Sequence, residues 1–250
     1  MPKKIKTFIF DIDGTISMSG KRVDKTILTE IETLIEKNSN IIFASARPIR
    51  DMLPMINDSL SHHCLFIGCN GGMAYQNNNF LFHNLLNNIY VEKIISLLKL
   101  RNIPYVLDGT WSFSLSKQPH DFHNYIQSLS CEKVDEEKLI NGGVSKILVL
   151  NDSILQEIST LFGENVSIHK HKSENFFDIT PINNNKFYTI NKLINNTPYV
   201  AFGNDQNDFL MLDNAEISVF VGNKRDYLNA NYYVNFDNIA HFIKKLGSDL

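Results

Sequence analysis

Two aspartates, Asp11 and Asp13, follow an apolar run in the segment KTFIFDIDGTIS. The run from Phe8 to Phe10 predicts a short buried strand, because aromatic and β-branched residues fit a sheet that is covered on both faces. With the strand period of two, both carboxylates project to the same side, and Gly14 lets the backbone turn tightly away. At a separation of about 4 Å and an effective dielectric near 20, their repulsion is on the order of 4 kcal/mol. The pair therefore needs a compensating feature, either a divalent cation or a shared proton.

A calcium-binding loop is one alternative explanation for aspartates at alternate positions before a glycine. Counted from Asp11, a twelve-residue loop ends at Arg22, where a calcium loop requires a bidentate glutamate. The spacing argues against this alternative. A solvated loop with incidental acids is the other one, and the preceding apolar run disfavours it.

The elements around these acids alternate between strand and helix. Apolar residues at helical spacing predict a helix in residues 23–37. This helix is followed by the buried strand NIIFA, a helix that can begin at Pro48, and the strand CLFIG. This order predicts an α/β fold with a doubly wound parallel sheet. Ligands of such sheets bind beyond the carboxyl ends of the strands, where Asp11, Asp13 and Ser45 fall.

The middle of the chain has a different pattern. Residues 83–182 predict helices at 89–101, 120–129 and 153–162, with strands between them and a turn at Asp108-Gly109-Thr110. Paired strands around such a turn indicate antiparallel pairing and an α+β module. The alternating pattern returns afterwards, so we predict a core formed by residues 1–82 and 183–250, with residues 83–182 inserted as a second domain.

Composition excludes several classes of function. The chain has 250 residues, 43% hydrophobic residues and a formal charge of −3, and it lacks the basic block expected of a nucleic-acid-binding protein. No apolar stretch approaches the roughly 20 residues needed to span a bilayer, and acids interrupt the N-terminus, which argues against a signal peptide. We therefore expect a cytoplasmic protein without a membrane partner. Cys64, Cys69 and Cys131 lack metal-site spacing and predict reduced thiols.

Four motifs in order resemble those of the haloacid dehalogenase superfamily of phosphohydrolases, and the inserted module resembles the α+β cap of its Cof-type subgroup. The first motif is DIDGT. The resemblance implies a Rossmann-like core, with Asp11 as the nucleophile that attacks phosphorus and Asp13 as general acid and later general base. It also implies that Gly14 and Thr15 help to bind the substrate phosphate. A carboxylate can hold a transient phosphoryl group, and a second one can serve both half-reactions.

The second motif is FASARP. The resemblance implies that Ser45 and the backbone N–H of Ala46 bind a phosphate oxygen, although the family more often has glycine at the position of Ala46. By itself, a serine after a strand more often caps a turn or a helix. Arg47 also fits the family, and the sequence leaves open whether it contacts substrate or braces the loop.

The third and fourth motifs follow the inserted module. Lys186 begins a core helix, and the resemblance implies that its ammonium offsets the charge of Asp11 and of the transferring phosphoryl group. In FGNDQND, Asn204 replaces the acid that usually follows the glycine, which removes one negative charge from the expected Mg²⁺ site and predicts weaker binding. Asp205 is an alternative ligand at the next position. The predicted metal ligands are Asp11, Asp13, Asn204 and Asp208, and Asn207 is a predicted phosphate contact. Without the other motifs, an Asx-rich turn would explain this segment equally well.

These features lead us to expect a magnesium-dependent phosphatase that acts on small phosphate monoesters, such as sugar phosphates or phosphorylated cofactors. A phosphomutase of the same superfamily and a phosphate-binding regulatory protein without turnover are the alternatives. The absence of a GxGxxG segment after any strand disfavours a dinucleotide-binding protein. Trp111, Phe113, His120 and His123 are candidate substrate contacts of the cap, although each is better explained as cap core or surface. We expect a monomer or weak homodimer.

Overall fold

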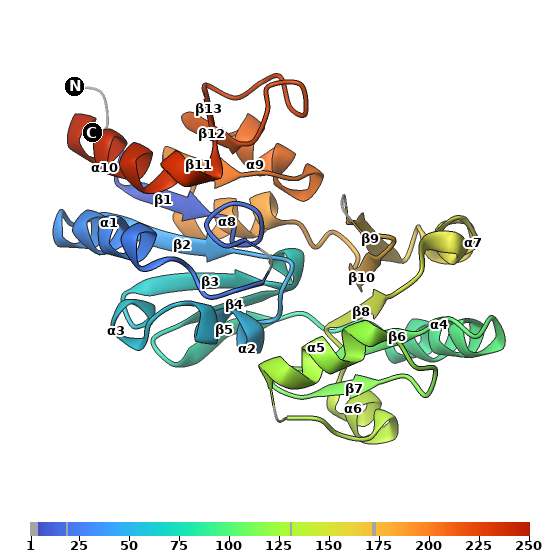
Figure 1. The fold of residues 1–250 in the computed structure, drawn as a ribbon. Coiled ribbons are helices and arrows are strands. Elements are labelled where there is room, and N and C mark those ends of the chain that lie inside the picture. Colours follow the sequence, from blue (N-terminus) through green and yellow to red (C-terminus); the bar gives the residue numbers. More distant parts are fainter. Residues whose placement is uncertain (1–4, 19, 131, 172–173) are drawn as a thin grey trace.

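The chain folds into two lobes (Figure 1). A cavity lies between them. The computed structural model describes residues 5–18, 20–130, 132–171 and 174–250. Within these residues the larger lobe contains an eight-stranded sheet and the smaller lobe a five-stranded sheet. We call the larger lobe the core and the smaller lobe, residues 88–181, the cap.

The core sheet is parallel over most of its width. Its order is β13-β12-β11-β1-β2-β3-β4-β5, and the pairs from β13 to β3 are parallel. The parallel strands are β1 (Thr7–Phe10), β2 (Asn40–Ala44), β3 (Cys64–Gly68), β11 (Tyr199–Gly203), β12 (Ile217–Val221) and β13 (Tyr232–Val234). The expected doubly wound α/β core is confirmed.

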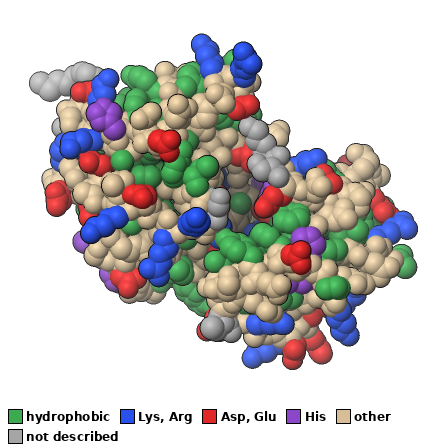
Figure 2. Space-filling view, in the orientation of Figure 1, with side chains coloured by type: hydrophobic (Ala, Val, Ile, Leu, Met, Phe, Trp, Pro, Cys, Tyr) green, Lys and Arg blue, Asp and Glu red, His purple; other side chains and the backbone are tan. Residues whose placement is uncertain are grey.

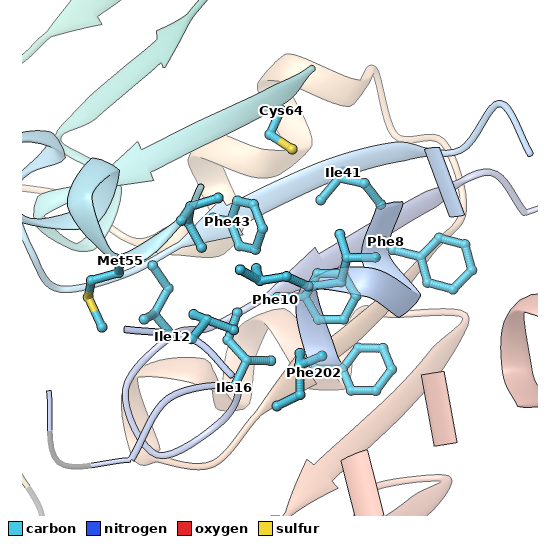
Figure 3. Packing of buried hydrophobic residues seen from close by; sticks show 14 of the residues in the cluster. Phe8, Phe10, Ile12, Ile16, Ile41, Phe43, Met55, Cys64 and Phe202 are labelled. Carbon is cyan, nitrogen blue, oxygen red and sulfur yellow. The ribbon is translucent and has the colours of Figure 1, made fainter. Parts of the chain in front are cut away.

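Strand β1 shows why the central sheet needs helices on both faces. Phe8 and Phe10 belong to the apolar cluster on one face, where Phe10 stacks on Phe202 with ring centroids 4.7 Å apart (Figure 3). Ile9 belongs to the cluster on the opposite face. Because side chains alternate along a strand, a continuous apolar run can be buried only between two helical layers.

The two helical layers come from separate parts of the chain. Helices α1 (Lys25–Glu36) and α10 (Ile239–Asp249) pack together on the face that contains Phe8. Helices α8 (Lys186–Ile194) and α9 (Phe209–Asp213) cover the other face. Between β2 and β3 lie α2 (Ile49–Met52), the 3₁₀ turn η1 (Leu53–Met55) and α3 (Asp58–Ser61), and Pro48 is the N-cap residue of α2.

The cap sheet is antiparallel, with the order β7-β6-β8-β10-β9. Its strands are β6 (Tyr105–Asp108), β7 (Phe113–Leu115), β8 (Lys146–Val149), β9 (Val166–Lys170) and β10 (Phe177–Pro181). Its helices are α4 (Asn88–Leu100), α5 (Asp121–Leu129), α6 (Glu136–Gly142) and α7 (Leu155–Phe162), the last preceded by η3 (Asp152–Ile154). The pairing of β6 with β7 confirms the expected hairpin. The domain boundaries at residues 83 and 182 stay a prediction, because strand pairing does not identify independent folding units.

The sequence did not predict two parts of the fold. Strands β4 (Met73–Gln76) and β5 (Asn79–His83) add an antiparallel edge to the core sheet, and α6 lies between α5 and β8. The turn between β4 and β5 uses Asn77 and Asn78 with positive φ angles of 50° and 62°. Asparagine tolerates this left-handed conformation, so an Asn-Asn pair can replace the usual Asn-Gly turn.

The cysteines that the structure describes agree with the expectation of reduced thiols. Cys64 and Cys69 are buried and free, and burial raises the pKa of the Cys64 thiol to about 12. Cys131 lies outside the described residues. Among the helices that the structure describes, none combines the length and apolar character that a membrane crossing requires.

Candidate active site

Asp11 lies at the carboxyl end of β1, in the middle of the parallel sheet. Its backbone N–H donates to the carbonyl of Phe202 on β11, and its side chain is almost fully buried. One carboxyl oxygen accepts from Lys186 Nζ at 2.6 Å and the other from Thr15 Oγ1 at 2.8 Å. Burial and the nearby charge of Asp208 raise the pKa of Asp11 to about 7, although Lys186 opposes this rise. Asp11 is thus shielded from water, and its two hydrogen bonds fix the orientation of its carboxyl group.

Lys186 supplies the positive charge beside Asp11. It is the first residue of α8, whose N-cap Asn185 accepts from the backbone N–H of Phe187. Its Nζ also donates to Asp208 at 2.7 Å, and the residue is only 1% exposed. Burial disfavours its charge, but the two carboxylates outweigh burial and raise the pKa of Lys186. The structure therefore brings Lys186 to Asp11, as the third motif led us to expect.

Asp208 has a structural role in this loop. It belongs to η4 (Gln206–Asp208), and its second carboxyl oxygen accepts from the backbone N–H groups of Asn204 and Asp205 at 3.0 and 3.2 Å. Together with the contact from Lys186, these bonds engage both oxygens of the buried Asp208. Asp208 therefore holds the loop that carries Asn204 and Asp205 in place. Its role as a metal ligand stays a prediction.

Asp13 lies differently from what the strand period predicts. Because β1 ends at Phe10, Asp13 is no longer on the strand, and it forms a bridge with Ser17 in the following turn. Both of its carboxyl oxygens accept from Arg47, at 2.6 Å from Nε and 2.8 Å from Nη2. Each acid therefore has its own cation, Lys186 for Asp11 and Arg47 for Asp13. This is a third way to offset repulsion, beyond the two that we considered from the sequence.

Oxygen donors meet where the metal was expected. The Asn204 Oδ1 atom lies 3.0 Å from Thr15 Oγ1, whose single hydrogen can go either to this oxygen or to Asp11. With the amide turned over, its nitrogen can instead donate to the backbone oxygen of Asp13 at 3.0 Å and to Asp11 Oδ2 at 3.2 Å. A Cβ atom on Gly14 would lie 2.1 Å from the Asn204 amide nitrogen, so only glycine permits this approach.

This donor set fits a hard cation when the Asn204 oxygen faces Asp11 and the carbonyl of Asp13. Among the residues that the structure describes, no three His, Cys, Asp or Glu side chains form a metal cluster. The candidate set therefore depends on one carboxylate, one backbone carbonyl and one amide. That set carries less negative charge than a site with an acid at position 204.

The predicted phosphate-binding residues divide into two groups. Gly14, Ser45, Ala46 and Asn207 line the cavity between the lobes. Ser45 Oγ also accepts from the backbone N–H of Arg47 at 3.1 Å, so it caps its turn as well as facing the cavity. Thr15 is fully buried and its hydroxyl contacts Asp11, so in this structure it supports Asp11 and does not line the cavity.

The cavity has a volume of about 670 Å³ and opens between core and cap (Figure 2). From the core it is lined by Asp11, Asp13 and the loops that follow β2 and β11. From the cap it is lined by α5 and by one face of the cap sheet. Functional groups at the carboxyl ends of the core strands thus face a second wall that belongs to the cap.

Polar residues of that wall were missed by sequence reasoning. Asp108 and Lys146 are register partners on β6 and β8, and Lys146 Nζ lies 3.5 Å from Asp108 and 3.3 Å from Asp178 of β10. Lys146 also donates to the carbonyl of Ala46 in the core at 3.1 Å. The signal was present, because a charged residue that begins the apolar strand KILV is unusual unless it faces a site.

Asn70 was also missed. It follows β3 in a left-handed conformation with φ 52°, and it is 1% exposed. Its side chain joins Asn207 in the core, at 3.2 Å, to Asp178 in the cap, at 3.4 Å. The left-handed backbone and the burial that mark Asn70 are visible only in the structure, so the sequence carried no signal for it.

None of the four candidate cap contacts lines the central cavity. Trp111 packs against Tyr75 and Phe80 of the core edge, and Phe113 is fully buried. His120 is the N-cap of α5, and His123 lies on the same helix. Both histidines border a separate hollow on the cap. These positions support the alternative that the four residues are cap core or surface.

Comparisons with known proteins place this geometry in a family. The profile of haloacid dehalogenase-like hydrolases matches residues 8–238. The candidate phosphatase YkrA of Bacillus subtilis (strain 168) is 24% identical, over 97% of this chain and 98% of its own length. The candidate phosphatase BU028/BU029 of Buchnera aphidicola (strain APS) is 26% identical, over 87% of this chain and 85% of its own.

Solved structures share the fold. SMU.1108c from Streptococcus mutans UA159 superposes with a TM-score of 0.85 and 19% identity, covering 98% of this chain and 100% of that one. BT4131, a subclass IIB sugar phosphatase of the haloacid dehalogenase superfamily, superposes with a TM-score of 0.78 and 19% identity. The match covers 97% of this chain and 99% of that one. The chain belongs to the family of haloacid dehalogenase-like hydrolases.

Proposed function

We propose that this protein is a magnesium-dependent phosphatase that hydrolyses small phosphate monoesters through a phosphorylated Asp11. The single observation that carries the proposal is the position of Asp11, a buried carboxylate held by Lys186 and Thr15 at the floor of a cavity. A carboxylate that is fixed in direction and weakly solvated is suited to attack an electrophile. The names of the curated relatives support a phosphatase activity.

The first half-reaction uses Asp11 and Asp13. An Asp11 oxygen forms a bond to phosphorus while the bond from phosphorus to the leaving oxygen breaks. The leaving oxygen takes a proton from the Asp13 carboxyl group. Lys186 lies 2.6 Å from Asp11, so its charge favours the approach of the anionic phosphoryl group.

The second half-reaction returns the enzyme to its starting state. Asp13, now a carboxylate, takes a proton from a water molecule whose oxygen attacks the aspartyl phosphate. The bond between phosphorus and the Asp11 oxygen breaks, which releases inorganic phosphate and restores the Asp11 carboxylate. The Asp13 side chain is 41% exposed, so it can reach both the leaving group and this water.

Asp11, the backbone carbonyl of Asp13 and Asn204 would hold the magnesium ion. When bound, the ion supplies positive charge that balances the phosphate and the neighbouring acids. Ser45, the backbone N–H of Ala46 and Asn207 would orient the phosphate, because each lines the same cavity. Asp208 would act by holding the loop that carries Asn204.

The substrate is expected to be a small phosphorylated metabolite, such as a sugar phosphate or a phosphorylated cofactor. The cavity volume of about 670 Å³ suits a molecule of that size. We further expect the protein to act in the cytoplasm as a monomer or weak homodimer.

A regulatory protein that binds phosphate without turnover is the second candidate, and Asn204 is the observation that favours it. An amide at this position lowers the negative charge of the metal site. Robust multiple turnover of p-nitrophenyl phosphate in excess magnesium would eliminate this candidate.

The test of the proposed function is a screen of phosphorylated metabolites with magnesium, in which free phosphate is measured. Release of free phosphate supports a phosphatase. An isomeric sugar phosphate as the product would instead show a phosphomutase. If neither product forms with any compound, the proposed activity is wrong.

The substitution Asp11→Asn tests the nucleophile. We expect turnover to fall on the order of 10³-fold or more. We also expect the fold to persist, because a neutral amide avoids the cost of burying charge that raises the pKa of Asp11. Circular dichroism and thermal unfolding check the fold, and Asp237→Asn, at an exposed acid of η5 (Phe236–Asn238), is the control. Retained activity would remove Asp11 as nucleophile.

A further inference from the structure

Arg47 lies between the acid of the core and the cap. Its Nε donates to Asp13 Oδ2 at 2.6 Å, and its Nη2 donates to Asp13 Oδ1 at 2.8 Å. The same Nη2 donates to Tyr125 Oη at 2.9 Å. The two hydrogens of one nitrogen are thus divided between the carboxyl group of Asp13 and a hydroxyl group of the cap.

Tyr125 belongs to α5, a cap helix that forms one wall of the cavity. Its ring packs against Phe122 with centroids 5.2 Å apart, and the Arg47 guanidinium lies 5.9 Å from its centroid. The ring therefore has its own support within the cap, while its hydroxyl reaches a core residue. This contact exists only when the cap is seated on the core as it is here.

The backbone of the core is shaped to admit this hydroxyl. Gly20 has a positive φ of 69°, and its carbonyl accepts from Tyr125 Oη at 3.5 Å. A Cβ atom there would lie 2.2 Å from Tyr125 Oη and 3.0 Å from Arg47 Nη2. Any larger residue would displace the hydroxyl, so the core provides a fitted position for it.

We propose that Tyr125 is a positioning residue, which acts through Arg47 to orient Asp13 only when the cap is seated. The proposal rests on the proposed function, because Asp13 must transfer a proton for its orientation to matter. Asp13 has no hydrogen bond from a cap residue among those that the structure describes, so Arg47 is its connection to the cap there.

The shape of the guanidinium explains how a hydroxyl of the cap can orient an acid of the core. Its nitrogens lie in one plane, and Nε and Nη2 both face the carboxyl group of Asp13. The bond from Nη2 to Tyr125 Oη fixes that plane from the cap side. Tyr125 therefore sets the direction from which Arg47 holds Asp13.

The substitution Tyr125→Phe removes the hydroxyl and keeps the ring. Its effect should depend on how much the leaving group needs a proton. For phenyl phosphate, a basic leaving group, we expect kcat/KM to fall about tenfold or more. For p-nitrophenyl phosphate, whose leaving group departs without a proton, we expect kcat/KM to stay within about threefold. Because kcat/KM reports only steps up to loss of the leaving group, water activation does not enter this comparison.

Tyr105→Phe is the matched control. Tyr105 is a buried cap tyrosine whose hydroxyl bonds to Glu136, away from the central cavity. Its loss should affect the two substrates equally. Gly20→Ala is the second test, because it displaces the hydroxyl from the core side and should reproduce the substrate dependence of Tyr125→Phe.

A double-mutant comparison tests the route through Asp13. With Asp13→Asn present, adding Tyr125→Phe should change kcat for p-nitrophenyl phosphate by less than about twofold. A further loss in the double variant would contradict the proposal, as would an equal loss on both substrates in the single variant. If the wild-type protein hydrolyses neither substrate, it is the proposed function that fails.

Discussion

At the scale of single residues, the site separates two acids by giving each its own partner. Lys186 pairs with Asp11, and Arg47 pairs with Asp13. A cation beside each carboxylate offsets the repulsion between two acids that are close together in the sequence. The amide of Asn204 lies beside Asp11 and the carbonyl of Asp13.

The substitution Asn204→Asp should tighten magnesium binding, by about tenfold, because it restores a negative charge to the donor set. Calorimetric titration with magnesium measures the change. Asn207→Asp is the matched control, because it adds the same charge to the same cavity without joining Asp11. Equal tightening by both variants would show that Asn204 acts through the general field and is not a ligand.

At the scale of elements, the hairpin of β9 and β10 brings titratable groups to the cavity. His171 follows β9, and its Nε2 lies 3.2 Å from Asp178 on β10. Burial disfavours the charged ring, but Asp178 and Glu174 outweigh burial and raise the pKa of His171 to about 9. Lys146 is the neighbouring cation that opposes this rise. The pair stabilises the hairpin only while the histidine is charged.

This pairing predicts how stability depends on pH. Below the unfolded pKa of 6.5 the histidine is charged in both states, and its stabilising pair is fully present. As pH rises through about 9, the folded protein loses the pair. The stability advantage of the wild type over His171→Gln should therefore shrink by on the order of 2 kcal/mol between about pH 6 and pH 10.

Urea unfolding across this pH range measures the difference. His63→Gln is the control, because it makes the same substitution at an exposed histidine. A difference for His171→Gln that stays constant across this pH range would show that folding does not raise the pKa of His171.

At the scale of the whole molecule, buried charges join the two lobes. Arg50 on α2 of the core pairs with its neighbour Asp51 and with Asp108 of the cap, both at 2.8 Å. Arg50 also lies over the ring of Phe113 in the cap, at 5.0 Å from the centroid. All three charged side chains are at most 5% exposed. The relative position of core and cap therefore decides whether these charges are satisfied.

The substitution Arg50→Met should lower the free energy of unfolding by about 3–5 kcal/mol, because it leaves the buried carboxylate of Asp51 without its cation and leaves Asp108 with Lys146 alone. Arg101→Met is the control. Arg101 pairs with Glu157 on the cap surface, with side chains 53% and 35% exposed, and its loss should cost much less stability than the loss of Arg50. Urea unfolding measures the loss of stability in both variants. Equal losses would contradict the view that Arg50, Asp51 and Asp108 are shielded from water.

The sequence by itself determined the parallel core and the edge of the sheet at which the site lies. Apolar runs such as Phe8 to Phe10 can be buried only in a covered sheet, and side chains that follow such strands must meet at their carboxyl ends. The positions of Asp11, Ser45 and Asn204 depend on these local rules, and so they could be predicted. The edge hairpin β4–β5 was missed because its turn uses asparagines in place of glycine.

Only the tertiary structure decided which charges meet. Arg47 is 34 residues from Asp13 and 78 from Tyr125, and Arg50 is 58 residues from Asp108. Such partners depend on how the cap sits over the core, which no periodicity within one strand or helix encodes. A side chain's neighbours along the chain set its element and its face, whereas its electrostatic partner is set by the packing of two separately formed sheets.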